Sequence, residues 1–246
     1  MRRRGKYIIK TFSSMGSTNS FLKENLSFFH DRTVIHADFQ RAGRGRRGNC
    51  WVSPAGRDLT FSVLYYLNKL SCNTEDLSLI ISVSICESLE KICLGGNFKL
   101  KWPNDVYVNY KKIAGILTEI VYSSKAAVAG CGINVNSTLE ERNKAPDSVS
   151  LYEIDKKIRQ PVEIMKTVLL HTEKNLEIAG ADRNCFMKHA NSFLFGKGRR
   201  VTASNPEEKI NGKISGINAE GLLVVDNEKN GQVLLGPHAR NLRFSD

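Results

Sequence analysis

Gln40-Arg-Ala-Gly-Arg-Gly-Arg-Arg-Gly-Asn-Cys-Trp51 is the most informative stretch of the chain, because glycine and arginine alternate there within an otherwise ordinary globular sequence. The three glycines within residues 43–48 allow positive φ angles and let a ligand approach the backbone closely. Successive backbone amides can bind an anion, and guanidinium groups can bind phosphate through paired hydrogen bonds. The spacing matches neither the P-loop pattern nor the dinucleotide-binding glycine pattern. The segment therefore predicts a basic loop that orders around an anion.

The net charge of +11 lies mostly in the first four-fifths of the chain. Residues 1–192 contain 28 basic and 19 acidic residues, whereas residues 193–246 contain 8 and 6. Four arginines fall within residues 41–47 alone. The alternative interpretation is an exposed arginine–glycine tether for nucleic acid. Such tethers usually lie in low-complexity tails, and this segment lies between two predicted strands, so a small anionic ligand is favoured.

The hydrophobic pattern before residue 193 indicates an α+β fold with a mixed sheet and flanking helices. Apolar residues at helical spacing predict helices over 18–29, from Asn73 or Thr74 to 92, and from Pro161 to 176. Short apolar runs between turn residues predict strands at 33–37, 58–67, 98–101, 106–109, 112–122 and 126–135. A hairpin turn at Asn109-Tyr-Lys111 favours this arrangement over a doubly wound parallel sheet.

After Gly196 the pattern changes to short strands with frequent turns, predicted at 199–203, 209–217, 222–226 and 232–235. Such strands are typical of a small β-barrel. We therefore expect two domains, residues 1–192 and residues 193–246.

The six cysteines form no Cys-x-x-Cys pair and have no metal-ligand spacing with the five histidines. A fixed metal site in the protein is therefore not expected, and a reducing, cytoplasmic setting is. No apolar run approaches the roughly 20 residues that a membrane helix needs. The basic start, Met1-Arg-Arg-Arg, lacks the apolar region of a signal peptide.

Three further clusters carry polar groups, and each is ambiguous alone. Lys101-Trp-Pro-Asn-Asp105 presents two polar side chains at a turn, which is also an ordinary turn sequence. In Lys112-Ile-Ala-Gly-Ile-Leu-Thr-Glu119, a period of two would place Lys112 on the same face as Ala114 and Ile116. That lysine either meets an anion or snorkels from the strand edge. The glycines of Gly130-Cys-Gly132 mark either room for a ligand or a bulge.

Taken together, the clusters resemble biotin–protein ligases over nearly the whole chain. The resemblance is carried by Ser17-Thr-Asn19, by the segment from Gln40 to Trp51, by Lys101–Asp105, by Lys112–Glu119 and by Gly132-Ile-Asn-Val-Asn136. It implies a class II synthetase-like biotin/lipoate ligase catalytic domain followed by a small SH3-like β-barrel. The implied function is nucleotide-binding protein modification, in which Mg-ATP activates biotin to biotinyl-adenylate and biotin passes to a carrier lysine.

The resemblance also assigns roles to residues. The implied biotin-binding residues are Ser17, Thr18, Asn19, Gln40, Arg44, Gly45, Arg46, Lys112 and Gly115. The implied nucleotide-binding residues are Arg44, Arg46, Trp51, Asn104, Lys112 and Asn134. Arg46, Lys112 and Asp105 are the implied catalytic residues. Asn104 and Asp105 face either the metal–phosphate region or the incoming lysine, and both roles stay open. The implied partner is the biotin carboxyl carrier domain of a carboxylase.

Two departures from the family pattern concern the basic loop. Asn49 and Cys50 are uncharged where the family usually continues with basic residues, which leaves the firmness of loop closure over the adenylate open. Because the ligase pattern starts within the first twenty residues, we expect no N-terminal DNA-binding domain. Two alternative functions are a lipoate or octanoate ligase of the same fold and a non-catalytic nucleic-acid-binding protein. Pairing into a homodimer through an edge strand is also left open.

Overall fold

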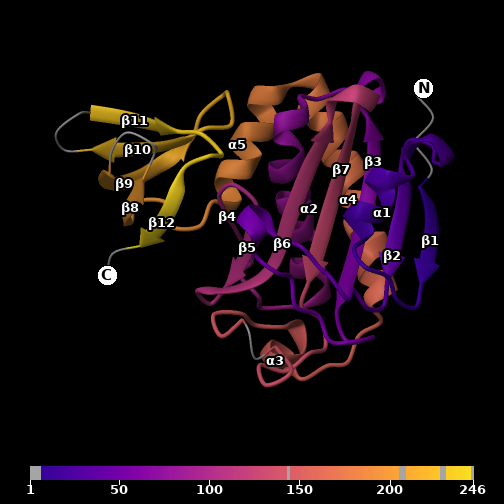
Figure 1. The fold of residues 1–246 in the computed structure, drawn as a ribbon. Helices are drawn as coiled ribbons and strands as arrows, with labels where there is room; N and C mark the ends of the chain where they lie inside the picture. Colours follow the sequence, from indigo (N-terminus) through magenta and orange to yellow (C-terminus); the bar gives the residue numbers. More distant parts are fainter. Residues whose placement is uncertain (1–6, 143–144, 205–208, 228–230, 245–246) are drawn as a thin grey trace.

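The computed structural model describes residues 7–142, 145–204, 209–227 and 231–244, which form two sheets and their connecting helices (Figure 1). The larger sheet has seven strands in the order β1-β2-β3-β7-β6-β5-β4. Their bounds are β1 Ile8–Phe12, β2 Thr33–Ala37, β3 Leu59–Tyr66, β4 Lys99–Lys101, β5 Asp105–Val108, β6 Lys111–Val121 and β7 Ala126–Ile133. Only β1 and β2 are parallel, so the sheet is mixed as predicted.

Helices cover the two faces of this sheet unequally. The long helices α2 (Leu77–Ile92) and α4 (Pro161–Ala181), together with α5 (Arg183–Phe193), pack on one face. Their apolar side chains join those of β3 and β7 in the main hydrophobic core. The short helix α1 (Thr18–Glu24) lies on the other face over β2, β3 and β7, with a smaller core of its own. Because α1 covers only part of that face, the rest of it is available for a binding site.

The second sheet is antiparallel and contains the C-terminal strands in the order β11-β10-β9-β8-β12. The strands are β8 Arg200–Ser204, β9 Lys209–Ile217, β10 Leu223–Asn227, β11 Gly231–Leu235 and β12 Arg240–Phe244. Its buried residues belong to the same contiguous core cluster as those of the larger sheet. Closure of these strands into a barrel and a domain boundary at residue 193 stay predictions, although α5 does end at Phe193.

The predicted strands are confirmed to within one or two residues at their ends. Both long helices are confirmed, but α2 begins at Leu77 after a 3-10 turn, Thr74–Asp76, and α4 continues five residues beyond the predicted end, to Ala181. The predicted helix over 18–29 is wrong in its second half, where the chain turns to a 3-10 helix, Leu26–Phe28. Four elements were not predicted from the sequence: β1, α3 (Leu151–Asp155), α5 and β12. Strand β1 is a mostly exposed edge strand, so it has no alternation of buried and polar residues to detect. No helix within the described residues is long and apolar enough to cross a membrane.

Candidate functional site

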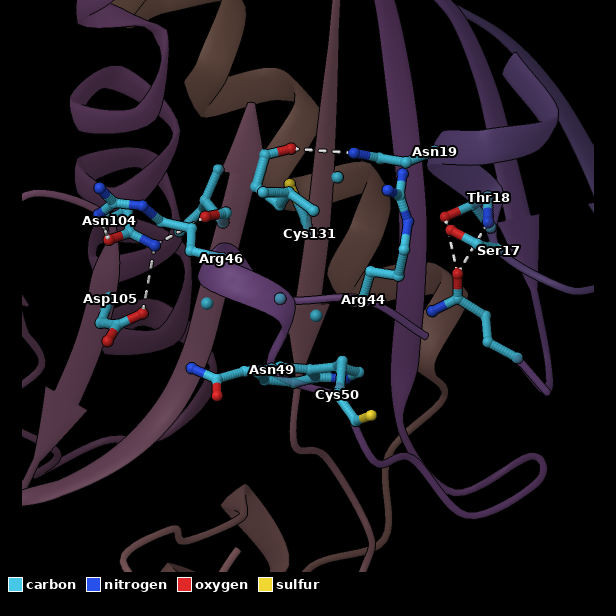
Figure 2. Close-up of a pocket in the computed structure, with 18 of the residues that line it drawn as sticks. Ser17, Thr18, Asn19, Arg44, Arg46, Asn49, Cys50, Asn104, Asp105 and Cys131 are labelled. Carbon is cyan, nitrogen blue, oxygen red and sulfur yellow. Dashed lines mark hydrogen bonds between the residues drawn. The ribbon is translucent and has the colours of Figure 1, made fainter. Parts of the chain in front are cut away.

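A cavity of about 230 Å³ opens on the face of the larger sheet that carries α1, and five stretches of the chain line it, within residues 17–19, 40–51, 104–105, 112–117 and 130–132. All but one of the sequence-predicted site residues line it, namely Ser17, Thr18, Asn19, Gln40, Arg44, Gly45, Arg46, Trp51, Asn104, Asp105, Lys112 and Gly115. Figure 2 shows Ser17, Thr18 and Asn19 on one side and Arg46, Asn104 and Asp105 on the other. The cavity thus has an end built on α1 and an end built on the basic loop.

At the α1 end, Ser17, Thr18 and Gln40 are held by hydrogen bonds between uncharged groups. Ser17 is the N-cap of α1 and accepts a hydrogen bond from the backbone N–H of Ser20. Both the backbone N–H and the hydroxyl of Thr18 donate to Oε1 of Gln40, at 2.8 and 3.1 Å. The Gln40 side chain therefore uses its oxygen within the protein and retains an amide N–H₂ as a donor for a ligand.

Glu119 connects the two ends, although the sequence analysis assigned it no role. Its carboxylate accepts from Asn19 Nδ2 at 2.8 Å, from Lys23 Nζ at 2.6 Å and from Arg44 at 2.8 Å. Burial would raise the pKa of Glu119, but the hydrogen bonds from Lys23 and Asn19 and the charge of Arg44 bring it below its usual value. The signal available in the sequence was its position on β6, four residues after Gly115 and on the same face.

The basic loop contacts both the larger sheet and the C-terminal sheet. Arg46 donates to Oδ1 of Asn104 at 2.6 Å and to the backbone carbonyl of Pro237. Arg47, which has a positive φ of 58°, donates to the carbonyl of Ala239 at 2.6 Å. Burial and the adjacent charge of Arg47 lower the pKa of Arg46. The loop is therefore positioned from two sides, and Arg47 is a contact that the sequence analysis missed.

Lys112 lies in the cavity, with Nζ 2.7 Å from Oδ1 of Asp105 and 5.6 Å from the ring centroid of Trp51. The expectation that it shares a face with Ala114 and Ile116 is wrong. The pairing of β5 with β6 shifts by one residue between Val106 and Tyr107, so Ile113 is extra. This β-bulge breaks the period of two and turns Lys112 to the cavity face.

The two glycines of β7 leave room for side chains that line the cavity. A Cβ atom on Gly130 would lie 2.2 Å from Oδ1 of Asn19, and one on Gly132 would lie 2.2 Å from the indole of Trp51. The register of β7 with both neighbouring strands is continuous, so neither glycine marks a bulge. The glycines therefore make room for Asn19 and Trp51, which are themselves part of the cavity wall.

Asn134 is the predicted residue that does not line the cavity. It is buried at the end of β7, and its side-chain amide donates to the carbonyl of Val149 at 3.0 Å. Asn49 and Cys50 do line the cavity, along the lower edge in Figure 2. Among the described residues, no group of three or more His, Cys, Asp or Glu side chains could hold a metal ion.

Comparison with known proteins identifies the family. The family model "Biotin/lipoate A/B protein ligase family" matches residues 11–136, which is just over half of the 246 residues. The chain belongs to this ligase family. The biotin protein ligase of Aquifex aeolicus, solved in complex with biotin and ATP, has a TM-score of 0.85 and 32% identity, covering 96% of this chain and 99% of that one.

Two curated relatives of this family member are bifunctional ligase/repressors named BirA. The Escherichia coli protein is 38% identical over 123 residues, which is 48% of this chain and 38% of the relative. The Bacillus subtilis protein is 29% identical over 210 residues, which is 79% of this chain and 61% of the relative. The alignments therefore span less than two thirds of the length of either curated relative.

Proposed function

We propose that the protein activates biotin with ATP to biotinyl-adenylate and then transfers biotin to a lysine of a biotin carboxyl carrier domain. The observation that carries this proposal is the convergence of Thr18, Arg46 and Lys112, from three distant segments, on one cavity. The structural neighbour from Aquifex aeolicus, described in complex with biotin and ATP, supports the same ligands.

The α1 end of the cavity suits the uncharged part of biotin. A ureido ring presents one carbonyl acceptor flanked by two N–H donors. Gln40 offers an amide donor, and Ser17 and Thr18 offer hydroxyl groups that can accept. Gly115 lets the backbone of β6 approach the ligand, since its position carries no side chain.

The other end suits the first chemical step. A biotin carboxylate oxygen attacks the α-phosphorus of ATP, the bond to the bridging oxygen breaks, and pyrophosphate leaves. Negative charge builds on the phosphoryl oxygens during this step, and fixed cations there stabilise the transition state. Arg46 and Lys112 are two of the four cationic side chains that line the cavity, and their present acceptors, Asn104 and Asp105, are groups that substrate oxygens would replace. Trp51 and Gly45 complete the nucleotide side of the cavity.

The second step transfers biotin to the carrier. The neutral amine of the carrier lysine attacks the acyl carbon of biotinyl-adenylate, AMP leaves, and the amine loses a proton. Asp105 is the carboxylate that lines this end of the cavity, so it can either accept that proton or hold Lys112 in place. We propose Mg²⁺ as the counter-ion that enters with ATP, and Asn104 and Asp105 would offer it side-chain oxygens at the loop end of the cavity.

Two features of the setting belong to the proposal. All six cysteines are free thiols, which suits a reducing cytoplasm. Homodimer formation stays a prediction; β1 is the edge strand of the larger sheet that could pair with a second copy, since β4 is already bridged to Leu194 and accepts from the N–H of Phe195.

The decisive test is incubation of the protein with biotin, Mg-ATP and a carrier domain, followed by intact-mass measurement of the carrier. We expect a mass increase of one biotin, dependent on both small molecules, and biotin-dependent exchange of pyrophosphate into ATP. Exchange that proceeds equally without biotin would contradict the proposal. A panel containing lipoate and octanoate in the same exchange assay distinguishes the other acids activated by this fold.

A further inference from the structure

Arg142 is the largest fully buried side chain of the described residues, and the proposed chemistry makes no use of it. Its guanidinium donates through Nε to Ser148 Oγ at 3.0 Å and through Nη1 to the carbonyl of Ser137 at 2.6 Å. The remaining nitrogen pairs with Glu153, which also completes the capping box of α3 with Ser150. Every nitrogen of the fork is thus hydrogen-bonded, and Arg142 ties together both ends of the segment 137–153.

A buried guanidinium is costly to desolvate, and an apolar side chain of similar volume is often equally stabilising. Overall stability is therefore a weak explanation for an arginine here. The planar guanidinium group does, however, fix the positions of several hydrogen-bond acceptors in one plane at the same time.

One of these acceptors, Ser148, belongs to a segment that pairs with β6. Ser148 forms a parallel β-bridge with Lys112, so residues 147–149 continue the sheet alongside β6 beyond the end of β7. The backbone N–H of Lys112 donates to the carbonyl of Asp147 at 3.0 Å, and the N–H of Val149 donates to the carbonyl of Lys112 at 2.9 Å. Both backbone polar groups of Lys112 are therefore held by this segment. Asn134 braces the same segment through Val149.

We propose that Arg142 is a positioning residue for Lys112, acting through Ser148 and the β-bridge that fixes the Lys112 backbone beside the bulge at Ile113. The expected effect of Arg142 on catalysis rests on the proposed function, whereas its expected effect on the Lys112 backbone does not. A lysine that emerges from a bulge lacks the regular ladder that would otherwise fix its direction. The buried arginine supplies that constraint from outside the strand.

The structural consequence is tested by hydrogen exchange of the Lys112 backbone amide. We expect Ser148→Ala, which removes one acceptor of Arg142, and Arg142→Lys, which cannot reach all the acceptors at once, to increase the exchange rate at Lys112. Arg159→Lys is the matched control, since Arg159 pairs with Asp155 in the neighbouring segment and its other hydrogen bonds go to Lys157, Ile92 and Asn136 rather than to residues 147–149. Unchanged protection of Lys112 in both test variants would overturn the proposal.

The catalytic consequence is tested by a double-mutant cycle with Lys112→Ala, measured as pyrophosphate exchange over a range of biotin concentrations at saturating Mg-ATP. Small misplacement of a catalytic group lowers rates by up to about 100-fold, so we expect Ser148→Ala to lower kcat roughly 10-fold with little change in KM for biotin. In the Lys112→Ala background it should have no further effect. Equal losses in both backgrounds would mean a general structural role and would overturn the proposal. If the wild-type protein shows no biotin-dependent exchange, the proposed function fails, whereas the hydrogen-exchange result still decides this inference.

Discussion

The two ends of the cavity are organised by different kinds of interaction. At the α1 end, Thr18 and Gln40 are joined by hydrogen bonds between neutral groups that a ligand can leave in place. At the loop end, Arg44 and Lys112 are paired with the carboxylates of Glu119 and Asp105. Hydrogen bonds that bind the substrate and the transition state equally well lower KM. Cations that bind charge which develops only in the transition state raise kcat. Under the proposed function, this difference assigns binding of the acid to the α1 end and its activation to the loop end.

The largest expected effect tests the loop end. Arg46→Ala should lower the maximal rate of biotin-dependent pyrophosphate exchange by about 100- to 1000-fold, the range for loss of one group that stabilises transition-state charge. Arg41→Ala is the control, because Arg41 lies in the same segment, is exposed and bonds to Ser14 away from the cavity. A similar loss of activity in both variants would indicate that total loop charge matters rather than the placement of Arg46.

The next largest effect is expected at the glycines of β7, Gly130 and Gly132, which form the floor of the cavity between its two ends. Gly132→Ala would push a methyl group into Trp51, so the indole must move. Overpacking of this kind costs about 1–3 kcal/mol, and we expect the free energy of unfolding in urea to fall by that amount. Gly16→Ala serves as the control, since a Cβ there meets nothing within 4 Å. Equal stability of the two variants would show that Trp51 is not seated against β7 in this way.

A smaller change is expected at the α1 end. Thr18→Val removes the hydroxyl that donates to Gln40 and accepts from Ser62, but keeps the shape of the side chain. Loss of the hydrogen bond that this hydroxyl would accept from biotin is worth about 1 kcal/mol, so KM for biotin should rise roughly five-fold while kcat stays near the wild-type value. Steady-state exchange kinetics measure both constants. A fall in kcat without a change in KM would contradict the assignment of binding to the α1 end and activation to the loop end.

The smallest effect is a pH dependence from Glu119, which links the ends. The pKa of Glu119 is lower in the folded protein than in the unfolded chain. Ionised Glu119 therefore stabilises the fold fully at pH values above its pKa in the unfolded chain, and this stabilisation is lost as the pH falls through its pKa in the folded protein. The side chain is partly exposed, and a contribution of about 1 kcal/mol or less is expected. Urea unfolding between pH 6 and pH 3 should show a shallower loss of stability for Glu119→Gln than for the wild type. Glu163→Gln, in an exposed ion pair, is the comparison variant and should follow the wild type.

Much of the fold was predictable because the central strands and long helices have strong periodic patterns. The cavity was predictable because its polar residues gather in a few motifs, such as Gln40–Trp51 and Lys101–Asp105. The direction of Lys112 was not predictable, since a bulge at Ile113 leaves no signature in the spacing of apolar residues. The role of Arg142 was equally hidden, because an arginine in a loop reads as exposed until its burial is known. Contacts between sheets, such as that of Arg47 with Ala239, depend on how distant segments meet.

The glycines of β7 restrict how this cavity can diversify. Any substitution at Gly130 or Gly132 adds at least a methyl group, and that methyl would overlap a wall residue rather than fill empty space. A change at either position therefore costs less stability once Asn19 or Trp51 has become smaller. Under the proposed function, adaptation towards a differently shaped acid is thus expected to begin at these two side chains, with substitution of the glycines following.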